Sequence, residues 1–149
     1  MRPMTVDDAA LVANWRYEGE ASVYNLDSDQ PLLAELACYF AVWDGDRLIG
    51  FCGTGIAARV PGISAEPGTL DIGMGMDPAL VGRGHGASFG QAVLDYLSMR
   101  HPGQTLRAVI KDWNARSLRL AQGLGFADIG ELIALQSGQP VAYRLLILR

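Results

Sequence analysis

Apolar residues recur along the chain with two different periods, one typical of helices and the other of strands. Residues 38–57 hold two β-rich runs on either side of Asp44-Gly45-Asp46, which is a hairpin signal. From Gly84 onward, apolar side chains recur on one helical face. The expected helices cover residues 5–16, 31–37, 84–101 and 114–124, and the strands after the hairpin cover residues 69–76, 105–111, 126–134 and 141–148.

This order of elements is that of a mixed α/β fold. The chain has 149 residues, and half of them are hydrophobic, which suits one domain with a substantial core. Residues 18–30 are polar with single aromatic side chains and predict a loop. Because no repeat, low-complexity run or linker interrupts the chain, we expect a single domain over residues 1–149.

Composition and charge exclude several classes of function. The net charge is −4 and the basic residues are sparse, so we expect no nucleic-acid partner. No segment has the apolar length of a membrane span or a signal peptide, so we expect no membrane association. Cys38 and Cys52 lie in apolar runs and are expected to be buried and reduced, which fits a cytoplasmic location. No cluster of Cys, His and acidic residues has metal-ligand spacing, so we expect no metal.

Residues 73–86, GMGMDPALVGRGHG, concentrate glycine where an expected strand meets an expected helix. Such a junction can bind an anion, because the first amide groups of a helix are unpaired and the helix dipole adds positive potential there. Gly82, Gly84 and Gly86 would let the backbone wrap a phosphate, and Arg83 would place a cation beside it. The alternative is a flexible turn without a ligand, although a turn needs fewer glycines.

Two other phosphate-binding motifs fit this segment less well. A Walker A loop requires Gly-Lys followed by Ser or Thr, and His85-Gly86-Ala87-Ser88 has no lysine. A dinucleotide-binding fold is a closer rival, because the glycines open a helix and Asp112 follows the next strand. However, the spacing is not GxGxxG, and the acidic residue lies nearer to about 30 than to about 20 residues further on.

Two motifs resemble those of the GNAT superfamily of acyl-CoA-dependent N-acyltransferases. Met76-Asp77-Pro78 followed by Val81-Gly82-Arg83-Gly84-His85-Gly86 is similar to the acyl-CoA motif of that family. The stretch from Asn114 to Phe126, NARSLRLAQGLGF, resembles its second motif, a helix that opens with Asn and ends in Gly-Phe. The resemblance is close over residues 69–130, and Asp71-Ile72-Gly73 is similar to the branch that includes ribosomal-protein N-terminal acetyltransferases.

The resemblance implies a GNAT-like fold, a mixed sheet of six or seven strands flanked by about four helices and splayed between the fourth and fifth strands. It also implies acetyl-CoA as co-substrate and direct transfer of the acetyl group to a primary amine of a small molecule or peptide. The implied cofactor contacts are backbone groups at the end of the fourth strand, with a bulge at Gly75, then the glycine loop, then side chains of the second motif. These residues are Met74, Gly75 and Met76; Val81, Gly82, Arg83, Gly84, His85 and Gly86; and Asn114, Ser117 and either Arg116 or Arg119.

Two positions depart from the family pattern. Val81 stands where Gln or Arg is usual, which removes a side-chain contribution but no backbone contact. Ala121 stands where many members place the Tyr that protonates the departing CoA thiolate. Ser117 is the nearby hydroxyl and becomes our catalytic candidate there. The missing Tyr also keeps open an alternative function, a CoA-binding sensor or regulatory module without turnover.

The resemblance also suggests Asp71 as the base that takes the proton of the amine, directly or through water. The alternative is that Asp71 forms a structural pair. In the early loop, Glu18, Glu20 and Asp27 would attract a cationic amine or simply form a solvated face.

Aromatic residues near the start of the chain are candidates for the acceptor site. Tyr17 and Tyr24 would line an apolar acceptor pocket, and Trp15 would either join them or pack in the core. At the other end of the chain, the final strand, VAYRLLILR, is apolar enough to pair across a homodimer.

Overall fold

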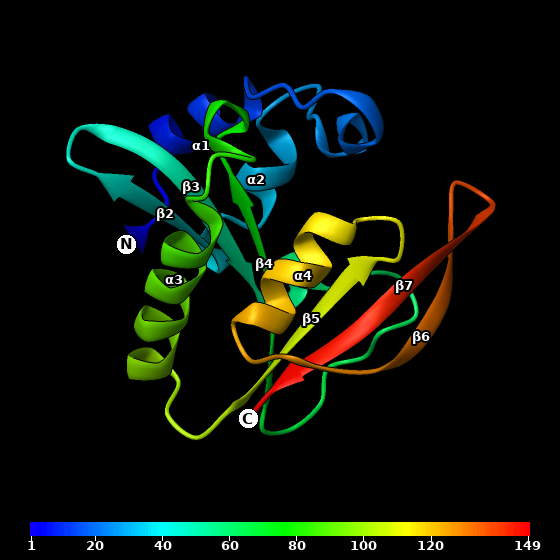
Figure 1. Ribbon diagram of the computed structural model, residues 1–149. Helices are drawn as coiled ribbons and strands as arrows, with labels where there is room; N and C mark the ends of the chain where they lie inside the picture. The colour runs from blue at the N-terminus through cyan, green and yellow to red at the C-terminus, as the bar shows by residue number, and fades with distance from the viewer.

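One mixed sheet of seven strands organises the protein in the computed structural model, which describes residues Met1 to Arg149 (Figure 1). The strand order is β1-β2-β3-β4-β5-β7-β6, and only β4 and β5 are parallel neighbours. The strands are β1 (Arg2–Pro3), β2 (Tyr39–Asp44), β3 (Arg47–Thr54), β4 (Thr69–Met76), β5 (Thr105–Lys111), β6 (Ala127–Gln136) and β7 (Gln139–Leu148). This architecture confirms the predicted fold class.

Helices cover both faces of the sheet. The α-helices are α1 (Val6–Ala13), α2 (Gln30–Ala34), α3 (Gly86–Arg100) and α4 (Ala115–Gly123). Short 3-10 helices add η1 (Gly19–Tyr24), η2 (Leu36–Cys38), η3 (Gly55–Ala58) and η4 (Pro78–Leu80). No helix qualifies as a membrane span, since even α3, the longest, has only 15 residues.

The predicted N-terminal helix is present and begins as its sequence indicates. The hydroxyl of Thr5 accepts the backbone N–H of Asp8, and the Asp8 carboxylate accepts the backbone N–H of Thr5. The helix ends earlier than predicted, at Ala13. Within the predicted loop of residues 18–30 the chain forms η1, which polar composition alone does not indicate.

The parallel strands β4 and β5 are joined over only part of their length. Their register runs from Thr69 opposite Thr105 to Ile72 opposite Ala108. Beyond these residues β4 continues to Met76, whereas β5 continues to Lys111 and pairs there with β7 alone. The two strands therefore diverge toward their carboxyl ends, which confirms the predicted splay (Figure 1).

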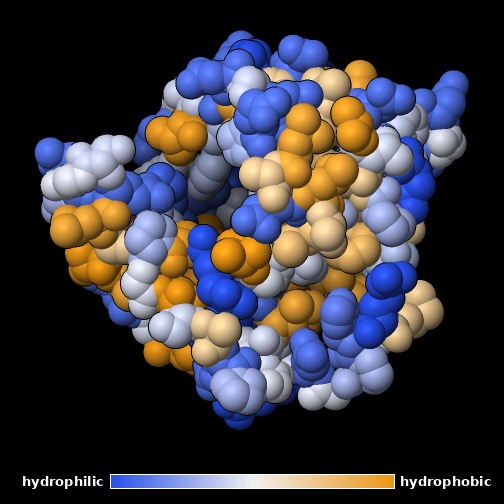
Figure 2. Space-filling view, turned by 180° about the vertical axis from the view of Figure 1, so that it is seen from behind, coloured by the Kyte–Doolittle hydropathy of each residue, from blue (hydrophilic) through white to orange (hydrophobic).

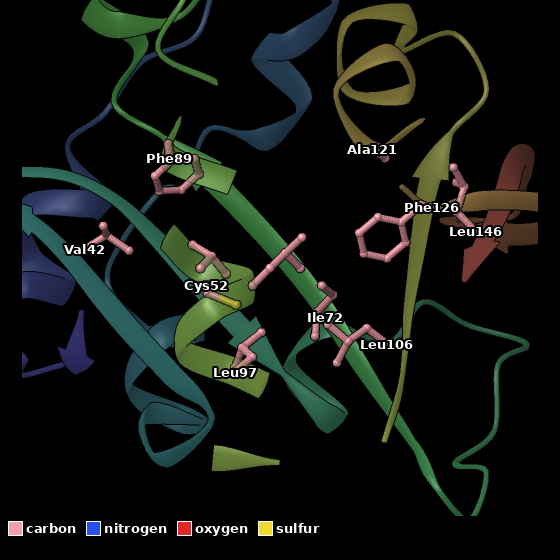
Figure 3. Packing of buried hydrophobic residues seen from close by; sticks show 11 residues of the cluster. Val42, Cys52, Ile72, Phe89, Leu97, Leu106, Ala121, Phe126 and Leu146 are labelled. Carbon is pink, nitrogen blue, oxygen red and sulfur yellow. The ribbon is translucent and has the colours of Figure 1, made fainter. Parts of the chain in front are cut away.

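A buried apolar cluster fixes α3 and α4 on one face of the sheet (Figure 3). The helical stripe predicted from residue 84 onward supplies Phe89, Val93 and Leu97, which pack against strand residues such as Ile72. Full burial of each such side chain stabilises the fold by roughly 1.5–3 kcal/mol. A second cluster lies under α1 and α2 and includes Ala9, Val12, Leu32, Ala41 and Leu48.

The prediction that the final strand pairs across a dimer is wrong. β7 lies between β5 and β6, and it is hydrogen-bonded to both of them. Its apolar side chains serve the core instead, since Leu146 is fully buried. The free edge at this end of the sheet belongs to β6.

Candidate active site

The glycine loop has the conformation that its sequence predicts. Gly82 and Gly84 adopt φ values of 76° and 82°, which only glycine adopts without strain, and α3 begins at Gly86. From Gly82 to Ser88, no backbone N–H donates a hydrogen bond within the chain. The loop and the first turn of α3 therefore form a run of unpaired donors beside the positive end of a helix dipole. This arrangement suits an anion with several oxygen atoms.

The loop and the neighbouring helix α4 carry three arginines, and none of them is paired with a carboxylate. Arg83 belongs to the loop itself, and Arg116 and Arg119 belong to α4. The Arg116 guanidinium lies against the loop, since a Cβ placed on Gly82 would be 3.5 Å from Nη2 of Arg116. Of the two arginines left open by the sequence, the structure brings Arg116 to the glycine loop.

The end of β4 presents backbone groups to the gap between β4 and β5. The N–H of Asp77 donates to the carbonyl of Ile49 on the β3 side, so by the alternation of a strand the amides of Met74 and Met76 point to the β5 side. No bond to β5 joins them, because the β4–β5 register ends at Ile72. The carbonyl of Met76 accepts the hydroxyl of Tyr17 at 2.7 Å.

The predicted bulge at Gly75 is absent. Residues of β4 from Ile72 to Met76 pair with β3 in unbroken register. Gly75 is required for a different reason, because a Cβ there would lie 2.5 Å from Cε1 of the Phe51 ring. The free backbone groups at this strand end arise from the splay rather than from a bulge.

The first residue of the second motif caps α4 and faces the same gap. Oδ1 of Asn114 accepts the backbone N–H of Ser117 at 3.2 Å, and Nδ2 of Asn114 donates to the hydroxyl of Tyr24 at 3.3 Å. The Ser117 hydroxyl makes no hydrogen bond within the chain. Asn114 and Ser117 therefore lie together at the N-terminus of α4.

Residues 17–25, which we call the strap, cross the open end of the splay. The Asn25 side chain closes the strap, because Oδ1 accepts the backbone N–H of Tyr17 at 2.7 Å and Nδ2 donates to the Tyr17 carbonyl at 3.1 Å. At one end Tyr17 bonds to Met76 of β4. At the other end Tyr24 packs on Trp113, just before α4, with ring centroids 6.1 Å apart. The strap thus connects the two strands where their own pairing ends.

Lys111 of β5 lies against two aromatic rings, one of which belongs to the strap. Nζ of Lys111 lies 6.0 Å from the ring centroid of Tyr24 and 5.9 Å from that of Tyr143. The Tyr143 hydroxyl is buried and has no hydrogen-bond partner. Burial raises the pKa of Tyr24 and of Tyr143, and burial together with the nearby Asp77 raises the pKa of Tyr17 to about 12. All three phenols are therefore protonated at neutral pH.

Asp71 lies on β4 where this strand is still paired with β5, before the two diverge, and it is 3% exposed. One carboxylate oxygen accepts a hydrogen bond from Nε of Arg59 at 2.7 Å, and the other accepts one from Nε of Arg107 at 2.6 Å. Arg107 also donates to Glu66 and to the carbonyl of Ser64, so this cluster anchors the segment before β4 to the sheet. The geometry favours the structural alternative for Asp71, since both of its oxygens are held by guanidinium groups.

The structure separates the remaining acceptor candidates. Trp15 packs against the second apolar cluster and lies 6.1 Å from Phe51, so it belongs to the packing of the fold. The three acidic candidates of the early loop form no ion pair, and Glu18 and Glu20 are exposed on the strap. Asp27 lies beyond the strap, between η1 and α2.

Ala121 is 7% exposed and belongs to the main apolar cluster (Figure 3). Its methyl group contributes to the packing of α4 on the sheet. No proton donor for a bound ligand therefore comes from this position of the helix.

The surface is hollowed beside the strap. In the view from the face opposite to that of Figure 1, a deep hollow lies between the protruding β6–β7 hairpin and the N-terminal helical segments (Figure 2). Comparison of the two views places this hollow next to the diverging ends of β4 and β5, on the face of the sheet opposite to α3 (Figures 1 and 2). The glycine loop and the hollow thus lie on opposite sides of the splay, so two molecules could meet at the free backbone of β4.

A family model described as an acetyltransferase (GNAT) domain matches residues 1–127 of the chain. No curated protein matches the sequence significantly. The co-substrate that goes with this domain family is acetyl-CoA.

Solved structures share the fold at low sequence identity. The Salmonella typhimurium protein yncA, determined with its cofactor acetyl-CoA, has a TM-score of 0.71 and 19% identity, covering 99% of this chain and 91% of its own. A GNAT-family acetyltransferase from Bacillus anthracis has a TM-score of 0.76 and 14% identity over 99% and 92% of the two chains. A ribosomal-protein-S5-alanine acetyltransferase from Vibrio fischeri has a TM-score of 0.68 and 19% identity over 99% and 90%. At these identities the likeness concerns the fold.

Proposed function

Because the chain belongs to the GNAT family of acetyltransferases, we propose that it transfers the acetyl group of acetyl-CoA to a primary amine by direct attack in a ternary complex. The observation that carries this proposal is the run of unpaired amides from Gly82 to Ser88 beside the free edge of β4. The unpaired amides suit a diphosphate, and the free edge of β4 suits the amide-containing arm that follows the diphosphate in CoA.

In this proposal the glycine loop binds the pyrophosphate through its backbone. The amides of Gly82 to Gly86 donate to the phosphate oxygens, and Arg83 and Arg116 balance their charge. His85 contributes through its main chain. The N–H of Val81 donates to the Pro78 carbonyl at 3.3 Å, so Val81 leads into the loop and offers no free amide to the phosphate. Arg119 lies farther along α4 as a third cation for the phosphates of CoA.

The free edge of β4 receives the pantetheine arm and the thioester. Met74 and Met76 supply the amides that face the gap, Gly75 gives the strand its close packing on Phe51, and Asn114 supplies a side-chain amide from the opposite wall. The amine attacks the thioester carbonyl, and a β4 amide stabilises the negative charge that forms on oxygen. Arg59 and Arg107 hold both oxygens of Asp71, so this carboxylate does not serve as the base. The acceptor therefore attacks as its free base.

The acceptor reaches the thioester from the hollow beside the strap. Exposed, unpaired Glu18 and Glu20 would attract a cationic amine to its rim. Small-molecule amines and peptide α-amines both fit this proposal, and the resemblance to ribosomal-protein acetyltransferases makes peptide N-termini one class to test.

One observation favours a second function, a CoA-binding sensor without turnover. Ala121 is part of the core, so α4 provides no phenol to protonate the thiolate. A sensor would bind acetyl-CoA through the same loop and release no free CoA.

Two measurements separate these functions. Calorimetric titration with acetyl-CoA should show binding at micromolar ligand, and absence of heat with folded protein would exclude both. Thiol release over a panel of small amines and peptides with free N-termini should then show turnover with at least one acceptor. Binding without thiol release from any acceptor would support the sensor.

Replacing Arg116 with alanine should weaken acetyl-CoA binding by about tenfold or more, because a charge-assisted hydrogen bond contributes about 1.5–3 kcal/mol. If Arg116 serves the pyrophosphate, calorimetry should show the same loss for acetyl-CoA and for an analogue lacking the 3′-phosphate. Arg100→Ala, at the far end of α3, is the matched control and should bind normally. A loss confined to acetyl-CoA would instead assign Arg116 to the 3′-phosphate.

A further inference from the structure

We propose that Tyr24, supplied by the strap rather than by α4, is the acid that protonates the CoA thiolate as it leaves. This assignment rests on the proposed acetyl transfer and deepens it by identifying a residue for the step that the second motif leaves without one. It follows from the placement of the Tyr24 hydroxyl at the N-terminus of α4 and from the contacts of the other hydroxyl groups nearby.

The Tyr24 hydroxyl is fixed with its proton free. Nδ2 of Asn114 donates to the phenolic oxygen at 3.3 Å, and the hydroxyl donates to no acceptor in the chain. Packing on Trp113 and an edge contact with Tyr17, with centroids 6.5 Å apart, hold the ring in place. The hydroxyl is therefore oriented, and its proton is available to a group lying between Asn114 and the end of β4.

The other hydroxyl groups of this region have different roles. Tyr17 donates its proton to the Met76 carbonyl at 2.7 Å. Tyr143 is 2% exposed, with Nζ of Lys111 5.9 Å from its ring centroid, so its hydroxyl is not accessible to a ligand. Ser117 has a free hydroxyl, but an alkyl alcohol is a far weaker acid than a phenol. Tyr24 is 41% exposed, so it combines a phenol with access to a ligand.

The charged surroundings of Tyr24 suit a transient loss of its proton. The hydrogen bond from Nδ2 of Asn114 favours the phenolate, and Nζ of Lys111 lies 6.0 Å from the ring centroid as a nearby cation. Burial acts in the opposite direction and raises the pKa, so the phenol carries its proton at neutral pH. The group is thus protonated at rest and has a cation nearby when it gives up the proton.

Bonds and protons balance in the proposed step. The nitrogen of the neutral amine forms a bond to the thioester carbon, and the carbon–sulfur bond breaks with its electron pair passing to sulfur. The sulfur takes the phenolic proton of Tyr24 and leaves as free CoA thiol. The phenolate then regains a proton from the nitrogen, which became positively charged on attack and is neutral in the amide product.

The test is Tyr24→Phe, with Tyr96→Phe as the matched control. Both changes remove one phenolic oxygen, and Tyr96 lies on α3 against Phe40, away from the splay. Because general acid catalysis typically contributes about 10²–10⁴-fold and a thiolate is already a good leaving group, we expect Tyr24→Phe to lower kcat by at least about tenfold. Calorimetry should show the affinity for acetyl-CoA unchanged, and Tyr96→Phe should match the unsubstituted protein in both measurements.

Each other outcome overturns the assignment. Unchanged kcat in Tyr24→Phe would show that Tyr24 donates no proton in the rate-limiting step. A raised KM for the amine with kcat unchanged would make Tyr24 a wall of the acceptor site. Weaker acetyl-CoA binding with kcat unchanged would show that Tyr24 only positions Asn114 for binding the cofactor. If the unsubstituted protein binds acetyl-CoA but releases no thiol with any acceptor, then the proposed acetyl transfer itself fails, which is a distinct result.

Discussion

Replacing Asp71 with alanine should lower the free energy of unfolding by about 3–5 kcal/mol, because it leaves buried guanidinium charge without its partner. Arg107 is 7% exposed, and its Nε would lose its only acceptor. A domain of this size has about 5–15 kcal/mol of stability, so the loss is a large fraction of the total. The melting temperature should fall by roughly 6–20 °C, and chemical denaturation should give the same ranking.

Asp128→Ala is the control for this experiment. Asp128 also accepts two hydrogen bonds, both from Arg144, but this pair joins the edge strand β6 to β7 and lies exposed. Its removal should change stability far less than the removal of Asp71. Full stability in Asp71→Asn, together with a turnover that no longer depends on pH, would contradict the structural role and identify Asp71 as the base.

Replacing Gly84 with valine should weaken acetyl-CoA binding by at least about 100-fold, as measured by calorimetry. Gly84 has a φ of 82°, and no atom lies within 4 Å of the position that a Cβ would take, so the fold has space for the side chain but the backbone conformation is strained. The loop must change its path to relieve that strain, and its amides then point away from the phosphates. Loss of two charge-assisted hydrogen bonds, at about 1.5–3 kcal/mol each, is enough for the expected effect.

Gly103→Val separates this effect from general strain. Gly103 has a φ of 78° and equally open surroundings, but it lies in the turn between α3 and β5. Both variants should lose similar stability, and only Gly84→Val should lose affinity in calorimetry. Equal affinities in the two variants would show that the loop conformation does not determine binding.

Much of the fold is predictable because its signals are local. The capping box at Thr5, the hairpin turn at Asp44 to Asp46 and the helical stripe that begins near Phe89 each follow from neighbouring residues, and each is present. The glycine loop is also a local signal, since Gly82 and Gly84 both adopt positive φ. Elements of two or three residues, such as β1, carry too little pattern to be predicted.

The rest of the site depends on contacts between residues distant in the sequence. The bond from Tyr17 to Met76 spans 59 positions, and the bond from Asn114 to Tyr24 spans 90. The pairing of Asp71 with Arg107 depends on the register of β4 and β5, which the sequence does not display. For the same reason the position of β7 inside the sheet, and the packing of Phe51 over Gly75, could not be predicted from composition or periodicity.

The proposed function depends above all on whether the backbone amides from Gly82 to Ser88 bind the pyrophosphate of CoA. A crystal structure of the protein grown with excess CoA would show this. We expect the diphosphate oxygens to lie within hydrogen-bond distance of several of these amides at the N-terminus of α3. A complex in which CoA is bound with its diphosphate elsewhere on the chain, and these amides facing only solvent, would contradict the proposal.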